Sequence, residues 1–347
     1  MKKATLFVVL IVLLGILTLQ FDLNSFLGSL KQVPLGYLLI LLALQCVTQL
    51  LLNYQWCRIG KAVGSPLGFV KMFYINAQGT LMESITPGVK VGGEVVRAVL
   101  LKKELDCSAD KAVAIVALQK LFSLSAFFGL NLLALFHISQ VVAMPGHLQG
   151  MIYLILLLLT GLMLAILFFP AKISAWLERL SPEHKWMKVG KGFLVELLVH
   201  TAKLKDSRLE WWKQFGLAAA IWFLFPVKLF ILVYAFSFNG SFLFTAEVAF
   251  ISYLMGMLPL TPGGLGSFEG TMTGLLLLMG LAVYDGAVIT VVFRFITFWF
   301  VVLMSIAVVA CWKIYQIRGV KDEANTTITQ CAYSNQHDPG ACGHLSG

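Results

Sequence analysis

Charged residues are scarce in this chain of 347 residues: Asp, Glu, Lys and Arg together make up 12% of it, against 59% hydrophobic residues. A soluble globular protein carries about 25% charged and about 45–50% apolar residues. The shortage of charge excludes a soluble enzyme. It also excludes a nucleic-acid-binding protein, which needs a basic surface. The composition instead indicates a polytopic membrane protein.

The sequence also lacks the motifs of metal and nucleotide chemistry. Its six cysteines contain no CxxC pair, so neither a zinc site nor a disulfide framework is indicated. HExxH, acidic DxD and nucleotide-binding motifs are absent, and the histidines are not at ligand spacing. We therefore expect no catalytic residue, no bound metal and no cofactor, and a membrane-embedded enzyme is the least favoured of the alternatives.

Six apolar segments are long enough to cross a bilayer, which takes roughly 20 helical residues. They are Ala4–Phe21, Pro34–Trp56, Ala112–Ile138, Gly150–Phe169, Phe215–Phe238 and Ala287–Trp312. Two further segments, about Leu67–Leu101 and Phe242–Leu281, are interrupted midway by Pro and Gly. We expect an all-α membrane protein with six transmembrane spans, in which each interrupted segment is a re-entrant hairpin of two broken helices.

The basic residues are distributed unevenly among the loops of this map. One side carries Lys2, Lys3, Arg58, Lys61, Lys71, nine basic residues within 172–213, Lys313, Arg318 and Lys321. The opposite loops carry Lys31 alone. Because Lys and Arg concentrate in cytoplasmic loops, we expect a multi-pass protein of the cell (inner, cytoplasmic) membrane with both termini in the cytoplasm.

The domain organisation follows from the same map. We expect residues 1–320 to form a single transmembrane domain. Segment 172–213 combines its basic residues with tryptophans, which predicts interfacial helices on the cytoplasmic face. Residues 321–347 contain Asn, Thr, Gly and Pro and few apolar residues, which predicts a disordered cytoplasmic tail.

An internal repeat relates the two interrupted segments. Shifting the chain by 175 residues aligns Thr86–Lys120 with Thr261–Phe295 without a gap, and 10 of the 35 positions are identical. Both copies read Thr-Pro-Gly, five residues, Glu, fifteen residues, Asp-x-Ala-Val. Three crossings separate the copies, so the second is inverted relative to the first. Inverted repeats with broken helices are typical of secondary transporters, whose site lies near the midplane.

We therefore expect repeat units at about 67–138 and 242–312. A duplicated helical bundle that serves packing alone is the alternative. A helix that begins inside the membrane presents backbone N–H groups and the positive end of its dipole, which attract a phosphate. The glycines at each break allow positive φ angles and close approach of the backbone.

Glu94 and Glu269 fall in the first turns after the two breaks. In the structural interpretation each carboxylate caps its helix or pairs with a cation. In the functional interpretation it titrates or binds a cationic group of the substrate. Lys90, Arg97, Lys120, Lys228 and Arg294 are the candidate counter-charges. We expect Arg294 to pair with Glu269, and Lys120 or Arg97 to pair with Glu94. Glu83 and Glu247 rank lower because they lack repeat equivalents, and Lys228, beside Pro226, is expected to extend toward the membrane surface.

Three features carry a resemblance to one known family, which extends over about residues 4–315. They are the motif PG-x3-GGE-x2-R in Pro87–Arg97, the motif PGGLGSFEG in Pro262–Gly270 and the arginine in the next span. The family is the lysylphosphatidylglycerol synthase transmembrane-region family of flippase-like membrane proteins. The resemblance implies a translocation site lined by Pro87, Gly88, Gly92, Gly93, Glu94, Arg97, Pro262, Gly263, Gly264, Gly266, Glu269 and Arg294, to which the expected pairing adds Lys120. In members fused to a cytoplasmic aminoacyl-lipid synthase, this region moves the aminoacylated lipid. This chain ends shortly after its last span, so we expect no synthase domain.

These features predict a lipid flippase or transporter. Its substrate would be a phosphate-bearing lipid: a phospholipid, an aminoacyl-phospholipid or a prenyl-linked lipid. Arg97 and Arg294 would pair with the phosphate, while Glu94 and Glu269 would hold the arginines or exchange a proton. The alternative is a non-catalytic scaffold whose partner is a membrane-bound lipid synthase or glycosyltransferase. A small-solute transporter and a homo-oligomer also stay open.

Overall fold

The computed structural model describes residues 28–29, 31, 33–86, 91–141, 146–179, 185–236, 240–258 and 264–316. Within these ranges every regular element is a helix. In chain order they are α3 (Leu35–Ala62), α4 (Phe69–Ile85), α5 (Val91–Leu105), α6 (Ala109–Val141), α7 (Gly146–Phe168), α8 (Pro170–Glu178), α9 (Lys185–Asp206), α10 (Arg208–Ala235), α11 (Phe242–Gly256), α12 (Ser267–Leu278), α13 (Val283–Arg294) and the π-helical turn η1 (Phe295–Trp299). The predicted all-α fold is confirmed for this part of the chain. The predicted span Ala4–Phe21 and the tail 321–347 lie outside the described residues.

Five helices within the described ranges are long and apolar enough to cross a membrane. They are Leu35–Ala62, Ala109–Phe136, Gln149–Phe168, Arg208–Ala235 and Val283–Gln316, the last of which runs through η1. They correspond to the predicted spans other than Ala4–Phe21. Two of them, α3 and α10, extend further than predicted at neighbouring ends, where Arg58 of α3 forms an ion pair with Glu210 of α10.

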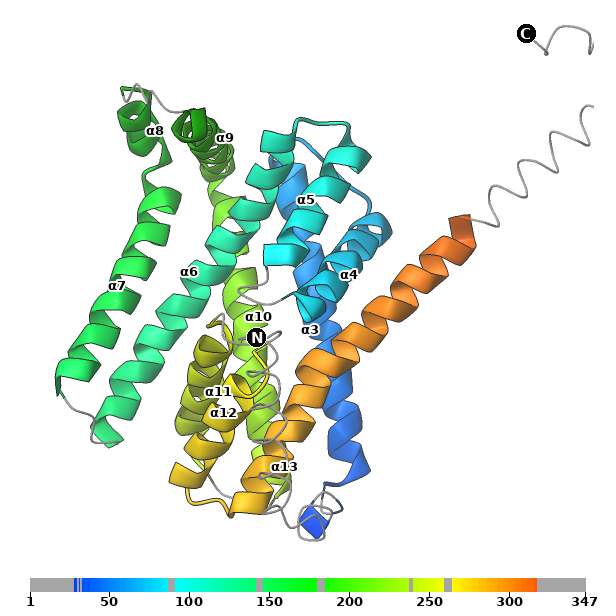
Figure 1. The fold of residues 1–347 in the computed structure, drawn as a ribbon, viewed down its shortest axis with the longest axis vertical. Helices are drawn as coiled ribbons and strands as arrows, with labels where there is room; N and C mark the ends of the chain where they lie inside the picture. The colour runs from blue at the N-terminus through cyan, green and yellow to red at the C-terminus, as the bar shows by residue number, and fades with distance from the viewer. Residues whose placement is uncertain are drawn as a thin grey trace, which may run out of the picture.

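Each of the two interrupted segments forms a pair of short helices that pack against each other, α4 on α5 and α11 on α12. Figure 1 shows α4 and α5 in the upper half of the molecule and α11 and α12 in the lower half. In both pairs the first helix ends and the second begins toward the middle of the molecule, so the two pairs approach each other from opposite ends.

Glycines permit the close approach at each break. A Cβ atom at Gly93 of α5 would overlap the Gly79 carbonyl oxygen and the Glu83 side chain of α4. A Cβ atom at Gly264 would overlap the Gly256 carbonyl oxygen at the end of α11, and Gly264 also has φ +70°. The expectation of close approach thus holds at both breaks. Among the described glycines of the two breaks, only those of the second break have positive φ angles. Gly93, at the first break, lies inside a regular helix.

The apolar core is divided between the two halves of the molecule. One cluster of buried side chains joins α3, α4, α5, α6, α9 and the first half of α10 around Phe122 and Trp211. A second joins the far half of α10 to α11, α12 and α13 around Phe268 and Phe293. Helix α10 packs against α3, α6, α9, α11 and α13 and so connects both clusters.

The Gly79–Gly93 contact provides a test of the hairpin packing. Replacing Gly93→Ala should lower the free energy of unfolding by about 1–3 kcal/mol, because the added methyl group overpacks a backbone contact. Gly129→Ala in α6 is the matched control, since no atom lies within 4 Å of the position that its methyl group would take and alanine is the better helix former. Thermal unfolding in mild detergent measures both, and equal melting temperatures for the two variants would contradict the packing.

Candidate functional site

A cavity of about 220 Å³ lies where the two broken helix pairs meet. Its wall is built from α3, α4, α5, α6, α10, α11, α12, α13 and the turn η1. The first pair contributes Glu83, Ser84 and Arg97, and the second contributes Gly256, Gly264 and Phe268. Segments from both halves of the chain therefore form one chamber, whose wall includes the charged side chains of Glu83, Arg97, Lys120 and Arg294.

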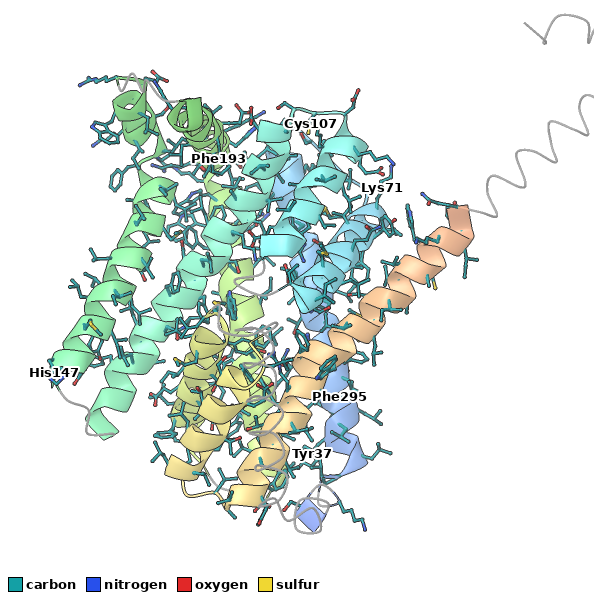
Figure 2. The ribbon with its side chains drawn as sticks, in the orientation of Figure 1. Tyr37, Lys71, Cys107, His147, Phe193 and Phe295 are labelled. Atoms are coloured by element: carbon teal, nitrogen blue, oxygen red, sulfur yellow. The ribbon has the colours of Figure 1, made fainter. Side chains whose placement is uncertain are left out.

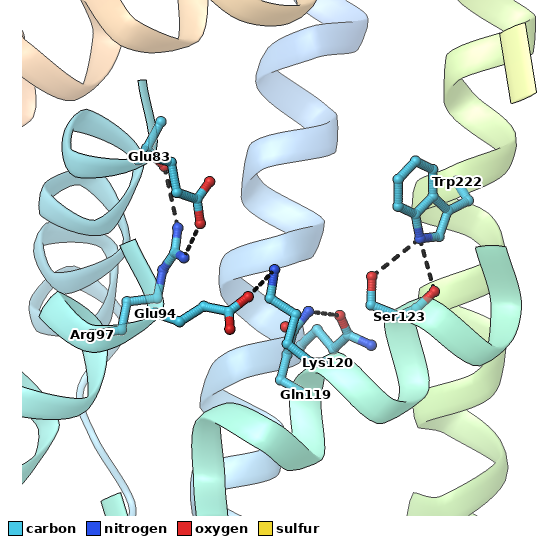
Figure 3. A network of polar contacts seen from close by, with 9 residues as sticks. Glu83, Glu94, Arg97, Gln119, Lys120, Ser123 and Trp222 are labelled. Carbon is cyan, nitrogen blue, oxygen red and sulfur yellow. Dashed lines mark hydrogen bonds and ion pairs between the residues drawn. The ribbon is translucent and has the colours of Figure 1, made fainter. Parts of the chain in front are cut away.

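The first pair carries two ion pairs, which Figure 3 shows together. Lys120 Nζ lies 2.7 Å from Glu94 Oε1, which confirms the expected partner of Glu94. Arg97, the other candidate, pairs instead with Glu83 and also donates to Thr80 Oγ1 at 3.4 Å. Its guanidinium lies 5.8 Å from the centre of the Trp56 ring. The low rank given to Glu83 was wrong.

The packing of α4 on α5 explains why Arg97 reaches Glu83. A Cβ atom at Gly79 would lie 2.6 Å from Arg97 Nε, so the missing side chain leaves the space that the guanidinium occupies. Arg97 is 5% exposed, and a charge with so little access to solvent needs a partner on the helix that covers it. That helix is α4, which carries Glu83.

The second pair holds Arg294 in a comparable way. Arg294 Nε lies 3.1 Å from Glu269 Oε1, as expected from the sequence. The guanidinium also contacts two aromatic rings, 4.7 Å from the centre of Phe268 and 4.4 Å from that of Phe298. It directly precedes the π-helical turn η1, and such turns often occur at functional sites. Arg294 is therefore held on three sides.

Glu269 combines the two roles that the sequence left as alternatives. Its Oε2 accepts the backbone N–H of Gly266 at 2.6 Å, so that it caps the N-terminus of α12, while Oε1 faces Arg294. Gly266 itself adopts φ +86° directly before the helix. One carboxylate thus fixes both the start of the second broken helix and the guanidinium in the next helix.

The two sets of contacts are equivalent in the repeat. In each copy a glutamate in the first turn after the break pairs with a cation in the helix that follows. The cation differs in position by one residue: Gln119, which aligns with Arg294, donates to Gln55 Oε1 at 3.2 Å, and the neighbouring Lys120 supplies the charge. Trp222 of α10 adds a further polar contact at this level by donating to the Ser123 carbonyl at 3.0 Å.

The remaining predicted site residues divide into two groups. Close contacts explain three of the glycines. A Cβ atom would meet Thr86 at position 92, Gly79 at position 93 and Gly256 at position 264. Of these, Gly264 also lines the cavity. Pro87, Gly88, Pro262 and Gly263 lie outside the described residues, as does Lys90.

Lys228 is the residue that the sequence placed wrongly. Its side chain is fully buried and does not extend to the membrane surface. It donates to Gln45 Oε1 and, at 3.2 Å, to Thr48 Oγ1 of α3. The polar pair Gln45 and Thr48 within an apolar helix is the sequence signal that could have indicated a buried cation. Among the described residues, no group of three His, Cys, Asp or Glu side chains could hold a metal ion.

Comparison with known proteins gives a consistent match over most of the chain. The family model described as lysylphosphatidylglycerol synthase TM region matches residues 4–305. A UPF0104 membrane protein of Methanothermobacter thermautotrophicus is 26% identical over 331 residues, which cover 89% of this chain and 95% of that protein. A UPF0104 membrane protein of Pyrococcus horikoshii is 22% identical over 327 residues, covering 88% and 96%. One of Methanocaldococcus jannaschii is 23% identical and covers 68% and 73%.

The Arg294–Glu269 pair can be tested by removing its charges singly and together. Glu269→Gln should lower the free energy of unfolding by about 3 kcal/mol, because it removes the carboxylate that faces the buried Arg294 guanidinium. Arg294→Met should lower it by about 1 kcal/mol, because the Glu269 side chain that it leaves is 25% exposed. The double variant should recover most of the larger loss. Lys120→Met is the comparison, since Lys120 and Glu94 are 25% and 27% exposed and should contribute only about 1 kcal/mol. Unfolding in mixed micelles measures the cycle; a double variant as unstable as the sum of the single ones would contradict the pairing.

Proposed function

Since this chain belongs to the lysylphosphatidylglycerol synthase TM region family, we propose that it is a lipid flippase or lipid transporter. It is a multi-pass helical membrane protein, and its substrate is a phosphate-bearing lipid that it moves between leaflets. The observation that carries the proposal is the cavity lined by both broken helix pairs, because irregular backbone at membrane depth is tolerated only where protein buries it or where it lines a wet cavity.

In the proposed topology the chain crosses the inner membrane six times, with α4–α5 and α11–α12 as re-entrant hairpins and both termini in the cytoplasm. The upper end in Figure 1 is then cytoplasmic. Support comes from Arg58, Lys61 and Lys71 near that end and from the helices α8 and α9. Trp176 and Trp212, at this end, are 60% and 63% exposed, as expected of rings at headgroup level.

The headgroup is bound where the helix N-termini of α5 and α12 approach the cavity. Backbone N–H groups at such ends attract phosphate, and Arg97 and Arg294 supply charge. A volume of about 220 Å³ is below the ~300–1,000 Å³ typical of pockets that enclose a whole drug-sized ligand. It therefore suits the polar headgroup, while the acyl or prenyl chains stay in the lipid. Glu83, Glu94 and Glu269 keep the cations compensated when the headgroup is absent.

Transport measured with the purified protein in vesicles tests this function. Wild-type protein should accelerate the movement of a fluorescent phospholipid between leaflets. Glu269→Gln should slow it about tenfold, the effect of roughly 1.4 kcal/mol on the barrier, because Arg294 loses its counter-charge and α12 loses an anionic cap. Glu178→Gln, at an exposed carboxylate of α8, is the matched control. No acceleration by wild type would favour the scaffold function, and an unchanged rate in Glu269→Gln would remove that residue from the mechanism.

Cysteine labelling tests the inverted hairpins. Cys107 joins α5 to α6 at the upper end of the molecule (Figure 2), and Ala282, its repeat equivalent 175 residues later, joins α12 to α13 at the lower end. In a background without other cysteines, an impermeant thiol reagent should label Cys107 only from the cytoplasm. It should label the variant Ala282→Cys only from outside. Labelling of both from one side would overturn the inverted arrangement.

A further inference from the structure

Helices α3 and α4 carry neutral polar side chains at a spacing of four residues. They are Gln49 and Asn53 of α3 and Asn76, Thr80 and Ser84 of α4. Residues four apart lie on the same face of a helix. Polar side chains at membrane depth are costly unless they face protein or a path for polar molecules. We call these five residues the polar seam.

A second, smaller cavity lies along the polar seam. Its volume is about 10 Å³, enough for about one water molecule. It adjoins the larger cavity, because Gln49, Leu52 and Thr80 line both. From there it extends to Asn53 and Asn76. Since α3 rises from the middle of the molecule toward its upper end and α4 descends from that end, the polar seam leads from the larger cavity toward the upper end (Figure 1).

The third wall of the smaller cavity is the helical segment 300–316, which follows η1 and which we call the end segment. It contributes Met304 and Ser305 to that wall. Figure 1 shows it as the orange helix that continues from α13 to the right-hand edge of the molecule. Of its residues, only Val301 and Ser305 are buried. The end segment therefore packs lightly against the rest of the described chain.

The two sides of the polar seam are held together differently. Between α3 and α4, Asn76 Nδ2 donates to Asn53 Oδ1 at 2.9 Å, and Asn53 Nδ2 donates to the Phe69 carbonyl at 2.9 Å. Ser305 instead donates to the Val301 carbonyl of its own helix at 2.8 Å. Among the described residues, no hydrogen bond or ion pair joins the end segment to α3 or α4. Local opening occurs where such contacts are fewest, which here is along the end segment.

Both ends of the end segment suit a movable wall. Beside the larger cavity it starts from η1, and π-helical turns are places where helices bend. Toward the upper end, Trp312 stacks on Tyr74 of α4, with ring centres 5.1 Å apart and an angle of 25° between the rings. Stacked rings close the polar seam at that end without hydrogen bonds that would have to break.

From this arrangement we infer that the polar seam is the path of the lipid headgroup between the larger cavity and the cytoplasmic leaflet, and that the end segment is its lateral gate. The gate opens when the end segment bends away from α4 at η1, which separates Trp312 from Tyr74. The amides and hydroxyls of the seam then replace the hydrogen bonds of the headgroup with water, while its chains stay in the lipid. The inference rests on the proposed function and deepens it, since it names the entrance to the same site.

A reversible cross-link across the gate tests the inference in vesicles. Tyr74→Cys and Trp312→Cys are combined in a background without other cysteines and bridged with a short bifunctional methanethiosulfonate. Bridging should slow the movement of the fluorescent phospholipid about tenfold, because gate opening becomes limiting, and dithiothreitol should restore the rate. An unchanged rate in protein whose mass shows the bridge would overturn the gate.

The matched control for the cross-link is Phe223→Cys combined with Phe242→Cys. These rings belong to α10 and α11, their centres are 5.7 Å apart, and neither residue lines either of the two cavities. Bridging them should leave the rate unchanged. A loss of transport in this control as large as in the gate pair would also overturn the gate, since any cross-link would then have the same effect.

Gln49→Leu tests the polar seam itself. It removes an amide that lines both cavities and should slow transport about fivefold, the effect of one hydrogen bond. Gln78→Leu is the matched control, because Gln78 of α4 is also half-buried and lines neither cavity. Equal rates in the two variants would exclude the headgroup from the polar seam.

Thiol labelling keeps the two proposals apart, because it does not require transport. Ala77→Cys, in the wall of the smaller cavity, should react with a water-soluble maleimide added from the cytoplasmic side each time the gate opens. Ala218→Cys, in the apolar cluster around Phe122, should not react. Labelling of Ala77→Cys without lipid transport retains the gate and rejects the flippase. Transport that persists after bridging, with Ala77→Cys unlabelled, overturns the gate and retains the flippase.

Discussion

Compensation of charge at the depth of the cavity is the constraint on which the other features depend. Arg97 and Arg294 are 5% and 6% exposed, and neither lipid nor the surrounding apolar clusters can solvate a guanidinium there. Each is held by a glutamate from a neighbouring helix, Glu83 and Glu269. Because these carboxylates belong to the broken helix pairs, the same contacts that stabilise the cations also fix the helices around the cavity.

The two broken pairs meet this constraint with different residues on a shared plan. Each closes over a contact between glycines, Gly79 with Gly93 and Gly256 with Gly264. Each then places a glutamate in the first turn of its second helix, facing a cation in the helix that follows. The first pair adds an ion pair across its own interface, whereas the second uses its glutamate also as a helix cap. The two pairs therefore share an arrangement, although the cations and the contacting glycines stand at positions that the repeat does not align.

The pairing also bears on how a lipid headgroup would be recognised. Cations that already have carboxylate partners bind an anion only in competition with those partners, so they provide shape and exchangeable contacts more than net attraction. In this view the paired arginines and glutamates define the shape of the chamber.

The sequence alone determined the class of protein, the position of five described long helices and the two breaks, because apolar length and interruption by Pro and Gly are local properties. It also determined the Glu269–Arg294 pair, since both charged residues fall within apolar segments, where each needs a partner. The tertiary structure alone decided that Arg97 turns to Glu83, because that choice depends on the space left by Gly79 on another helix. It decided likewise that Lys228 is enclosed instead of reaching the membrane surface: a lysine within a span can do either, and only the helix packed over it, here α3 with Gln45 and Thr48, settles which.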